Sequence, residues 1–309
     1  MRIASFLPSA TETLFAIGAG DQVYAVTFEC DHPVEARSKP HVVFSHLPPG
    51  LTPAEIDAIV SAEGAQGRSL YFVEYDRLES LAPTLVVLQD LCRVCAIDSP
   101  TLARDMSRLS SAPQIVSLAA HSIPDILREI EMLGDLTGHT TQARALTQSL
   151  AERLERIREA RSGTQRRKRV LCLEWLDPPF LGGHWVPEMA LIAGADSILS
   201  SPATKSVRTT WQQIAAADPE VIVLMPCGFN LQQTIDQFHA LTLPPEWHNL
   251  PSVVAGEVYA VNGSAYFSRH GPRFIDGLEI LDAILHPTGD SSDLSRFAHL
   301  PAESVRRVS

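Results

Sequence analysis

Short apolar runs alternate with amphipathic stretches along the first 120 residues of the chain. Four of these runs have the length of buried β-strands: residues 2–7, 22–28, 84–89 and 114–119. After the first run, Ser9 and Glu12 have the spacing of a helix capping box, and Gly18 favours a helix end. Strands that alternate with helices predict a parallel sheet covered on both faces, so residues 1–120 are expected to form an N-terminal α/β lobe.

The stretch from residue 123 to residue 161 consists almost entirely of helix-forming sequence. Its apolar residues recur at spacings of three and four: Leu133, Leu136, Ala143, Leu146, Leu150, Leu154 and Ile157. Gly134 and Gly138 weaken the beginning of this pattern, which predicts a short helix followed by a long one. Residues 121–165 are therefore expected to form a helical bridge.

A second α/β pattern follows the bridge. Residues 170–175, 221–225 and 258–261 are apolar strands, and residues 273–285 form an amphipathic closing helix. We expect a C-terminal lobe over residues 166–286 and a loose polar tail over residues 287–309. The predicted fold class is α/β, with two Rossmann-like lobes, each built on a parallel sheet, joined by a long backbone helix.

The net charge and the hydropathy of the chain argue against some classes of partner and indicate where the protein is located. The net charge of -11 argues against general binding of nucleic acid or of anionic membranes, because phosphate groups would be repelled. No apolar stretch is long enough for direct membrane insertion. The N-terminal residues turn polar by Ser9 and lack the pattern of a secretory signal. We expect a cytoplasmic protein, or a periplasmic one if a leader has been removed.

The chain contains five cysteines, an odd number that fits reduced thiols or thiolate ligands better than a fully paired disulfide framework. Cys172 lies inside a predicted strand and is expected to be core. The other four follow strand ends: Cys30, Cys92, Cys95 and Cys227. If a cleft brings them together, they could bind zinc or an iron–sulfur cluster. Alternatively, Cys92 and Cys95 are a redox-sensitive or merely structural pair.

Ligands of open α/β sheets bind beyond the carboxyl ends of the strands. The residues that follow these ends, together with nearby aromatic residues, are candidate ligand-binding residues: Phe28, Glu29, His32, Trp175, Asp177, Phe180, His184, Trp185, Phe229, Tyr266 and Phe267. The aromatic members would form an apolar wall with few polar anchors, as ligand pockets usually have. His184 and Glu188 are one helical turn apart and could share a cation, or Glu188 could simply stabilise a helix N-terminus.

Catalytic signatures are weak. Cys30 and His32 could form a nucleophile–base pair, but their spacing alone does not show that the two groups meet. The sequence contains no Gly-x-Ser-x-Gly motif, phosphate loop or dinucleotide fingerprint. A binding protein is therefore favoured over an enzyme.

Five segments, in order, carry a resemblance to a known family. They are IASFLPSATETLFAIG (residues 3–18), VYAVTFECDHPVEA (23–36), DPPFLGG (177–183), WQQIAAADPEVIV (211–223) and AYFSRHGPR (265–273). Over residues 1–285 the chain resembles class III, or helical-backbone, substrate-binding proteins, and among them most closely the cobalamin-binding proteins of ABC-type vitamin uptake.

The resemblance implies two lobes bridged by a rigid helix, with a corrinoid or another metal chelate held between them. In such proteins cleft aromatics cover the corrin ring, and Phe180, Tyr266 and Phe267 fall on ligand-facing positions. Arg269 of the last segment is also expected to bind the ligand. Acidic residues on each lobe dock onto an ABC-type permease, and Asp76 falls near the docking position of the first lobe.

The chain departs from this family pattern in two places. Residues 50–68 look like an insertion, and the cysteines Cys92, Cys95 and Cys227 are foreign to the exported cobalamin-binding pattern, which suggests an intracellular subgroup. The leading interpretation is a receptor for cobalamin or a related corrinoid, with a thiolate or His32 as a possible cobalt ligand. The second is a metal- or iron–sulfur-dependent protein, with or without enzymatic activity, on a recruited binding fold. The third is a carrier of zinc or of an iron chelate.

Overall fold

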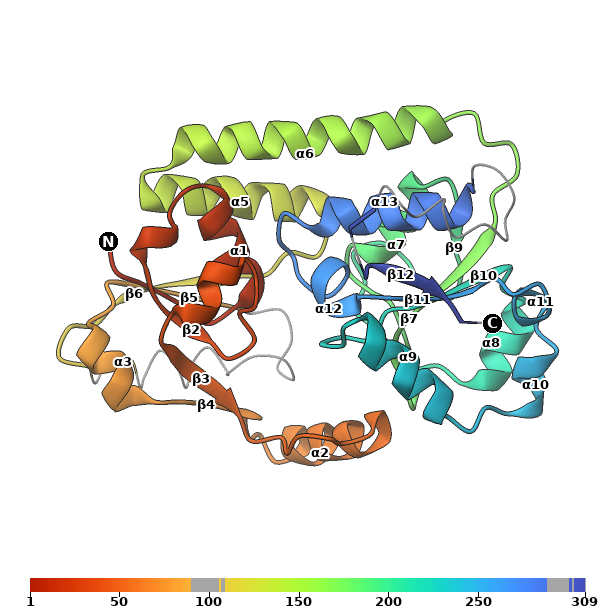
Figure 1. Ribbon diagram of the computed structural model, residues 1–309, viewed down its shortest axis with the longest axis horizontal. Helices are drawn as coiled ribbons and strands as arrows, with labels where there is room; N and C mark the ends of the chain where they lie inside the picture. Colours follow the sequence, from red (N-terminus) through yellow and green to blue (C-terminus); the bar gives the residue numbers. More distant parts are fainter. Residues whose placement is uncertain (90–105, 107–108, 288–299, 302, 309) are drawn as a thin grey trace.

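Two β-sheets form the centres of two α/β lobes, and a pair of long helices runs along one side of both (Figure 1). The computed structural model describes residues 1–89, 106, 109–287, 300–301 and 303–308. The two-lobed α/β fold class predicted from the sequence is confirmed. Across the described part of the chain, every helix is too short or too polar to cross a lipid bilayer.

The N-terminal sheet has the strand order β4-β3-β2-β1-β5-β6. All neighbouring strands are parallel except β3 and β4, which are antiparallel. The elements of this lobe are β1 (Ile3–Ser5), α1 (Pro8–Ala16), β2 (Val23–Thr27), β3 (His41–Ser45), α2 (Pro53–Ala65), β4 (Tyr71–Val73), α3 (Tyr75–Leu81), β5 (Leu85–Gln89) and β6 (Gln114–Leu118), with short 3-10 turns at Gly20–Gln22 and Val34–Ser38.

The predicted capping box at the first helix is wrong. Helix α1 begins at Pro8, and Leu7 occupies the cap position, two residues before the predicted cap Ser9. Proline is well suited to the first helical turn, where its missing N–H is not needed. Ser9 and Glu12 are consequently both inside the helix. Both are buried, and Glu12 binds two arginines of the other lobe instead of capping the helix.

The C-terminal sheet has the strand order β12-β11-β10-β7-β8, with β9 beside β7. Its elements are β7 (Arg169–Leu176), β8 (Pro179–Leu181), α7 (Val186–Ile192), β9 (Asp196–Ser197), α8 (Trp211–Ala217), β10 (Val221–Leu224), α9 (Leu231–Ala240), α10 (Pro245–His248), α11 (Pro251–Val254), β11 (Val258–Val261), α12 (Gly263–Tyr266), α13 (Phe274–Leu285) and β12 (Val305–Arg307). Both sheets contain the predicted parallel strands, but each is mixed, because β4, β8 and β12 are antiparallel to their neighbours. Strand β12 lies in the segment expected to be a loose tail and pairs with β11.

The helical bridge consists of α5 (Ile123–Thr137) and α6 (Thr140–Arg161), which confirms the predicted short helix followed by a long one. Gly138 ends α5 with a φ of 76°, a conformation that glycine adopts without strain. A Cβ atom at Gly134 would lie 2.3 Å from the Cβ of Ala143, so this glycine allows the two helices to pack closely.

The bridge contacts both lobes. Helix α5 packs on α1 of the N-terminal lobe, and α6 packs on α7 and α13 of the C-terminal lobe. Arg153 of α6 binds Asp276 and Glu279 of α13, and Arg161 of α6 binds Asp282. The two helices therefore tie the lobes together along one side, as Figure 1 shows. The domain limits at residues 120, 165 and 286 stay a prediction.

Candidate functional site

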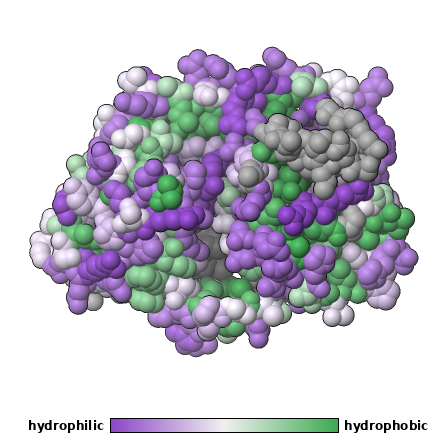
Figure 2. Space-filling view, viewed as in Figure 1, coloured by the Kyte–Doolittle hydropathy of each residue, from purple (hydrophilic) through white to green (hydrophobic). Residues whose placement is uncertain are grey.

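A cavity with a volume of about 680 Å³ lies between the lobes. In the view of Figure 2 the surface is hollowed between the two lobes. The cavity is bordered by residues at or just beyond the ends of β1 and β2 of the first sheet and of β7 and β10 of the second. This is the place where parallel sheets offer loop residues and backbone groups to a ligand. We call it the inter-lobe cavity.

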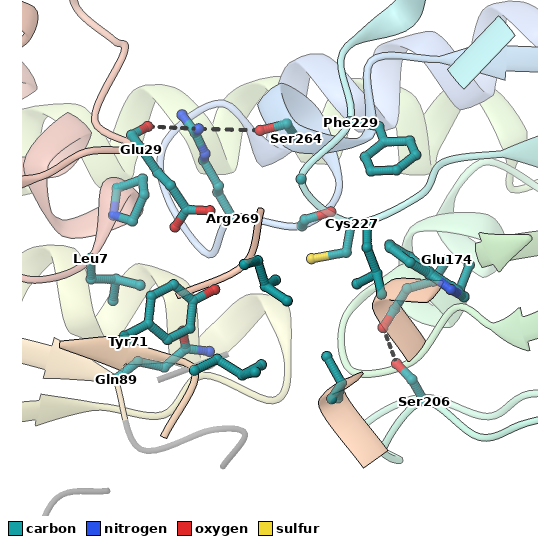
Figure 3. Close-up of a pocket in the computed structure, with 18 of the residues that line it drawn as sticks. Leu7, Glu29, Tyr71, Gln89, Glu174, Ser206, Cys227, Phe229, Ser264 and Arg269 are labelled. Carbon is teal, nitrogen blue, oxygen red and sulfur yellow. Dashed lines mark hydrogen bonds between the residues drawn. The ribbon is translucent and has the colours of Figure 1, made fainter. Parts of the chain in front are cut away.

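The walls of the inter-lobe cavity are largely apolar. Trp175 and Phe229 of the C-terminal lobe lie with ring centroids 5.4 Å apart, and Phe180 lies nearby on β8. The N-terminal lobe contributes Leu7 and Tyr71, among others (Figure 3). Such a surface suits a ligand with a broad apolar face and a few polar groups at its rim.

Glu29 projects into this apolar space from the turn after β2 (Figure 3). Among the residues that the structure describes, none makes a hydrogen bond to its carboxylate. Arg269 donates to the backbone oxygen of Glu29 at 3.2 Å. Burial raises the pKa of the Glu29 carboxyl group, and Arg269 opposes the shift only in part. Desolvation of this carboxylate costs free energy that the free protein does not recover by pairing.

A buried ion network holds the lobes together beside the cavity. Arg269 donates to Glu12 at 2.8 Å and to Asp31 at 2.6 Å. Arg273 donates to both oxygens of Glu12, at 2.5 and 2.9 Å. Glu12 is only 3% exposed, so it depends on these partners for its charge. Arg269 was predicted to bind ligand; it lines the cavity, but its guanidinium is engaged in joining the lobes.

The opposite wall carries a second carboxylate, Glu174 on β7. Its oxygens accept hydrogen bonds from Ser206 Oγ at 2.5 Å and from the backbone N–H of Gly183 at 3.3 Å (Figure 3). The Cys227 thiol is partly exposed and faces the same cavity. Polar groups are thus present on both lobes, with apolar surface between them.

The predicted insertion forms helix α2, which reaches from the N-terminal lobe to the other side of the cavity (Figure 1). Arg208 of the C-terminal lobe donates to both carboxylate oxygens of Asp57 at 2.8 Å and to Ser61 Oγ at 2.9 Å. Trp175 donates to the backbone oxygen of Pro53 at 3.2 Å. Helix α2 therefore forms a wall of the cavity that is attached to both lobes.

Histidines line the seam between the lobes. His121 Nδ1 lies 3.2 Å from His184 Nδ1, and the rings of Trp185 and His270 are 5.8 Å apart. Burial lowers the pKa of both His184 and His270 to about 4, so both rings are neutral near pH 7. Glu188 accepts a hydrogen bond from the backbone N–H of Ile123 at 2.9 Å. Its carboxylate thus joins α7 to the bridge.

The predicted site residues fall into two groups. Those that line the inter-lobe cavity are Glu29, Trp175, Phe180, Cys227, Phe229 and Arg269. Those that do not line it are Phe28, Cys30, His32, Asp177, His184, Trp185, Tyr266 and Phe267. Phe28 is 40% exposed, Phe267 is 1% exposed within the core, and His32 borders a smaller polar cavity of about 260 Å³.

Of the four cysteines predicted to bind metal, the structure describes Cys30 and Cys227, and these two have different surroundings: Cys227 lines the inter-lobe cavity and Cys30 does not. Cys30 is buried in the core with its sulfur 3.1 Å from Thr11 Oγ1, and burial raises the pKa of its thiol to about 12. A protonated thiol is a poor metal ligand. Cys92 and Cys95 lie outside the described residues. Within the described ranges, no cluster of three or more His, Cys, Asp or Glu side chains has the geometry of a metal site.

Several cavity residues escaped the sequence analysis, including Ile56, Val60, Arg208 and Ser206. Ile56 and Val60 lie on α2, whose sequence was recognised only as an insertion. Arg208 and Ser206 lie in an irregular segment after β9, and no strand end marks them. The expectation that ligands bind beyond the carboxyl ends of strands (the strand-end rule) therefore identified cavity residues near the ends of the sheets. It missed the cavity residues that α2 and the segment after β9 contribute.

Comparisons with known proteins agree with this architecture. The sequence profile of the family described as periplasmic binding protein matches residues 3–265. An uncharacterised ABC transporter substrate-binding lipoprotein of Bacillus subtilis is 24% identical over 293 residues, which cover 93% of this chain and 80% of the relative. The vitamin B12-binding protein of Vibrio parahaemolyticus is 20% identical over 285 residues, covering 90% of this chain and 86% of the relative.

Solved structures show the same fold. The periplasmic vitamin B12 binding protein of Vibrio cholerae has a TM-score of 0.67 at 19% identity, covering 92% of this chain and 96% of that chain. A periplasmic heme binding protein from Pseudomonas aeruginosa has a TM-score of 0.70 at 17% identity, covering 94% of each.

These relatives correct the predicted location. The matching family is periplasmic, and the relatives include a lipoprotein and periplasmic proteins. The cytoplasmic location expected from the N-terminal residues is wrong, because homologues of this chain work outside the cytoplasm. The comparisons likewise give no support to the predicted iron–sulfur cluster.

Proposed function

The chain belongs to the periplasmic binding protein family, and on that premise we propose that it is a receptor for cobalamin or a related corrinoid, bound in the inter-lobe cavity. The observation that carries the proposal is the cavity itself, which has aromatic walls on an apolar space between two lobes. Its volume of about 680 Å³ lies within the range of roughly 300–1,000 Å³ that is typical of small-molecule pockets.

The aromatic wall of the cavity favours a planar macrocycle as the ligand. Trp175, Phe180 and Phe229 lie at the same side of the cavity, where rings can pack against the face of a corrin. Relatives found by sequence are named for vitamin B12, and this favours a corrinoid over other chelates. In this proposal the ligand's metal is cargo, bound as part of the chelate.

Delivery to an ABC-type permease completes the proposal. Substrate-binding proteins of this family serve ABC importers, and the Bacillus subtilis relative is named as such a component. Asp76 is exposed on α3 and remains the candidate docking residue of the first lobe.

Quenching of tryptophan fluorescence tests the proposal. Trp175 lies in the cavity wall, so titration with cyanocobalamin or cobinamide is expected to quench its emission with a stoichiometry of one. Phe180→Ala is expected to weaken binding by roughly tenfold or more, because a buried aromatic face is worth about 1.5–3 kcal/mol. The matched control is Phe44→Ala, since Phe44 stacks on Phe72 and does not line the cavity. Absence of corrinoid binding by the wild-type protein would contradict the proposal.

A further inference from the structure

Three described carboxylates line the inter-lobe cavity, and one of them, Asp57, is paired with Arg208. The other two face the cavity from opposite lobes, Glu29 from the N-terminal lobe and Glu174 from the C-terminal lobe (Figure 3). The two differ in their partners. Glu174 accepts hydrogen bonds from Ser206 and Gly183. The carboxylate of Glu29 accepts none from the residues that the structure describes, although Tyr71 and Gln89 line the same cavity. Glu29 is therefore the acceptor that the protein leaves open.

The cations of the cavity are already neutralised. Arg269 binds Glu12 and Asp31, and Arg208 binds Asp57. His270 is buried and neutral near pH 7. Among the described lining residues, therefore, the positive charges are paired, while the negative charge of Glu29 is not. An anionic ligand would meet an open carboxylate without meeting an open cation.

This charge pattern distinguishes between metal chelates that share a planar shape. A carboxylate accepts hydrogen bonds and repels other carboxylates, and both effects are strong where water is excluded. A ring whose side chains end in amides offers N–H donors to Glu29. A ring whose side chains end in free carboxylates brings like charges together in an apolar space, and this repulsion rejects it.

We propose that Glu29 is the specificity-determining residue of the cavity, which selects corrinoids with amide or cationic side chains and rejects chelates with free carboxylates. The inference rests on the proposed function, because it names the chemical class of ligand for the same site. The unpaired carboxylate is a cost to the free protein, and ligand donors offset that cost only in the complex.

The experiment compares two probes that share one ring. Cobinamide carries amide side chains, and its hydrolysed form carries carboxylates at the same positions. Dissociation constants of both are measured by tryptophan fluorescence and by calorimetry at pH 7.5. The wild-type protein is expected to bind cobinamide at least 100-fold more tightly than the hydrolysed form. In Glu29→Gln this preference is expected to fall by tenfold or more, because the neutral amide removes the repulsion and weakens the acceptor.

Two further variants separate recognition from folding. Glu29→Asp keeps the charge on a shorter side chain, and it is expected to keep most of the preference. Glu35→Gln is the matched control; Glu35 is exposed in the same lobe and does not line the cavity, so the preference should be unchanged.

The possible failures are distinguishable. If the wild-type protein binds both probes with equal affinity, the inference is overturned while the proposed function stands. An unchanged preference in Glu29→Gln also overturns it. If neither probe binds to the wild-type protein, the proposed function fails, and the inference fails with it.

Discussion

Two glutamates of the N-terminal lobe lie near the same arginine but have opposite environments. Glu12 of α1 is almost fully buried and accepts hydrogen bonds from Arg269 and Arg273. Glu29 follows β2 and lines the cavity, yet Arg269 binds only its backbone oxygen. The comparison shows how one guanidinium can join two lobes while a neighbouring carboxylate stays open. A paired carboxylate stabilises the structure, and an unpaired one in a cavity is available to a ligand.

Removing the paired glutamate should have the largest effect on stability. Glu12→Gln leaves Arg269 and Arg273 buried with too little negative charge, so the free energy of unfolding is expected to fall by about 3–5 kcal/mol. Urea unfolding measures this change. The matched control is Glu155→Gln, which breaks the exposed pair of Glu155 with Arg158 and should cost less than about 1 kcal/mol. An equal loss of unfolding free energy in the two variants would contradict the claim that the buried pairs of Glu12 stabilise the protein more than an exposed pair does.

A third carboxylate, Glu129 of α5, lies between these extremes. One of its oxygens accepts the backbone N–H of Ala119 at 2.6 Å, and the other is buried without a partner among the described residues. Burial raises the pKa of Glu129 to about 7. The folded protein therefore holds this proton more tightly than the unfolded chain does, and this group's stability contribution is lost as the pH rises from about 4.5 to about 7.

Glu129→Gln should remove that pH dependence. The variant is expected to be more stable than the wild-type protein at pH 8 by on the order of 1–2 kcal/mol, since the side chain keeps some contact with water. At pH 4 the difference should vanish. Urea unfolding at a series of pH values measures it, and a difference that does not change with pH would show that Glu129 is not the titrating group.

The smallest effect on stability is expected from a variant at the contact between α2 and the C-terminal lobe. Arg208 is largely exposed, so Arg208→Ala should change the stability by no more than about 1 kcal/mol. The same variant frees one attachment of a cavity wall, so the dissociation rate of cobinamide should rise by roughly two- to fivefold. Stopped-flow displacement measures this rate. Arg158→Ala is the control, because Arg158 lies on α6 away from the cavity. An unchanged rate would mean that α2 does not retain the ligand.

The alternation of strands and helices was sufficient to predict two α/β lobes and a helical bridge. Antiparallel edge strands escaped it, because β4, β8 and β12 are short and carry no long apolar run. The paired residues Ser9 and Glu12 matched a local capping pattern, but Pro8 fixes the helix start, and the partners of Glu12 are about 260 positions away in the chain. A local pattern contains no information about such contacts.

The candidate site was partly predictable for a similar reason. The strand-end rule identified Glu29, Trp175 and Phe229, which line the cavity. It could not separate Glu29 from its neighbour Cys30, because the turn after β2 directs one side chain to the cavity and the other to the core. Nor could it assign a role to the insertion, since the contacts of α2 depend on how the lobes face each other.

The central claim is that Glu12, paired with two arginines, holds the two lobes together, and that Glu29, whose carboxylate is unpaired, binds the ligand. Its most direct test is the free energy of unfolding of wild type and Glu29→Gln, each with and without cobinamide at about 100 times the wild-type dissociation constant. We expect the free variant to be at least as stable as wild type. Cobinamide should then stabilise wild type by about 2.7 kcal/mol and the variant by at least 1 kcal/mol less. A free variant as unstable as Glu12→Gln, with an undiminished gain from cobinamide, would contradict the account.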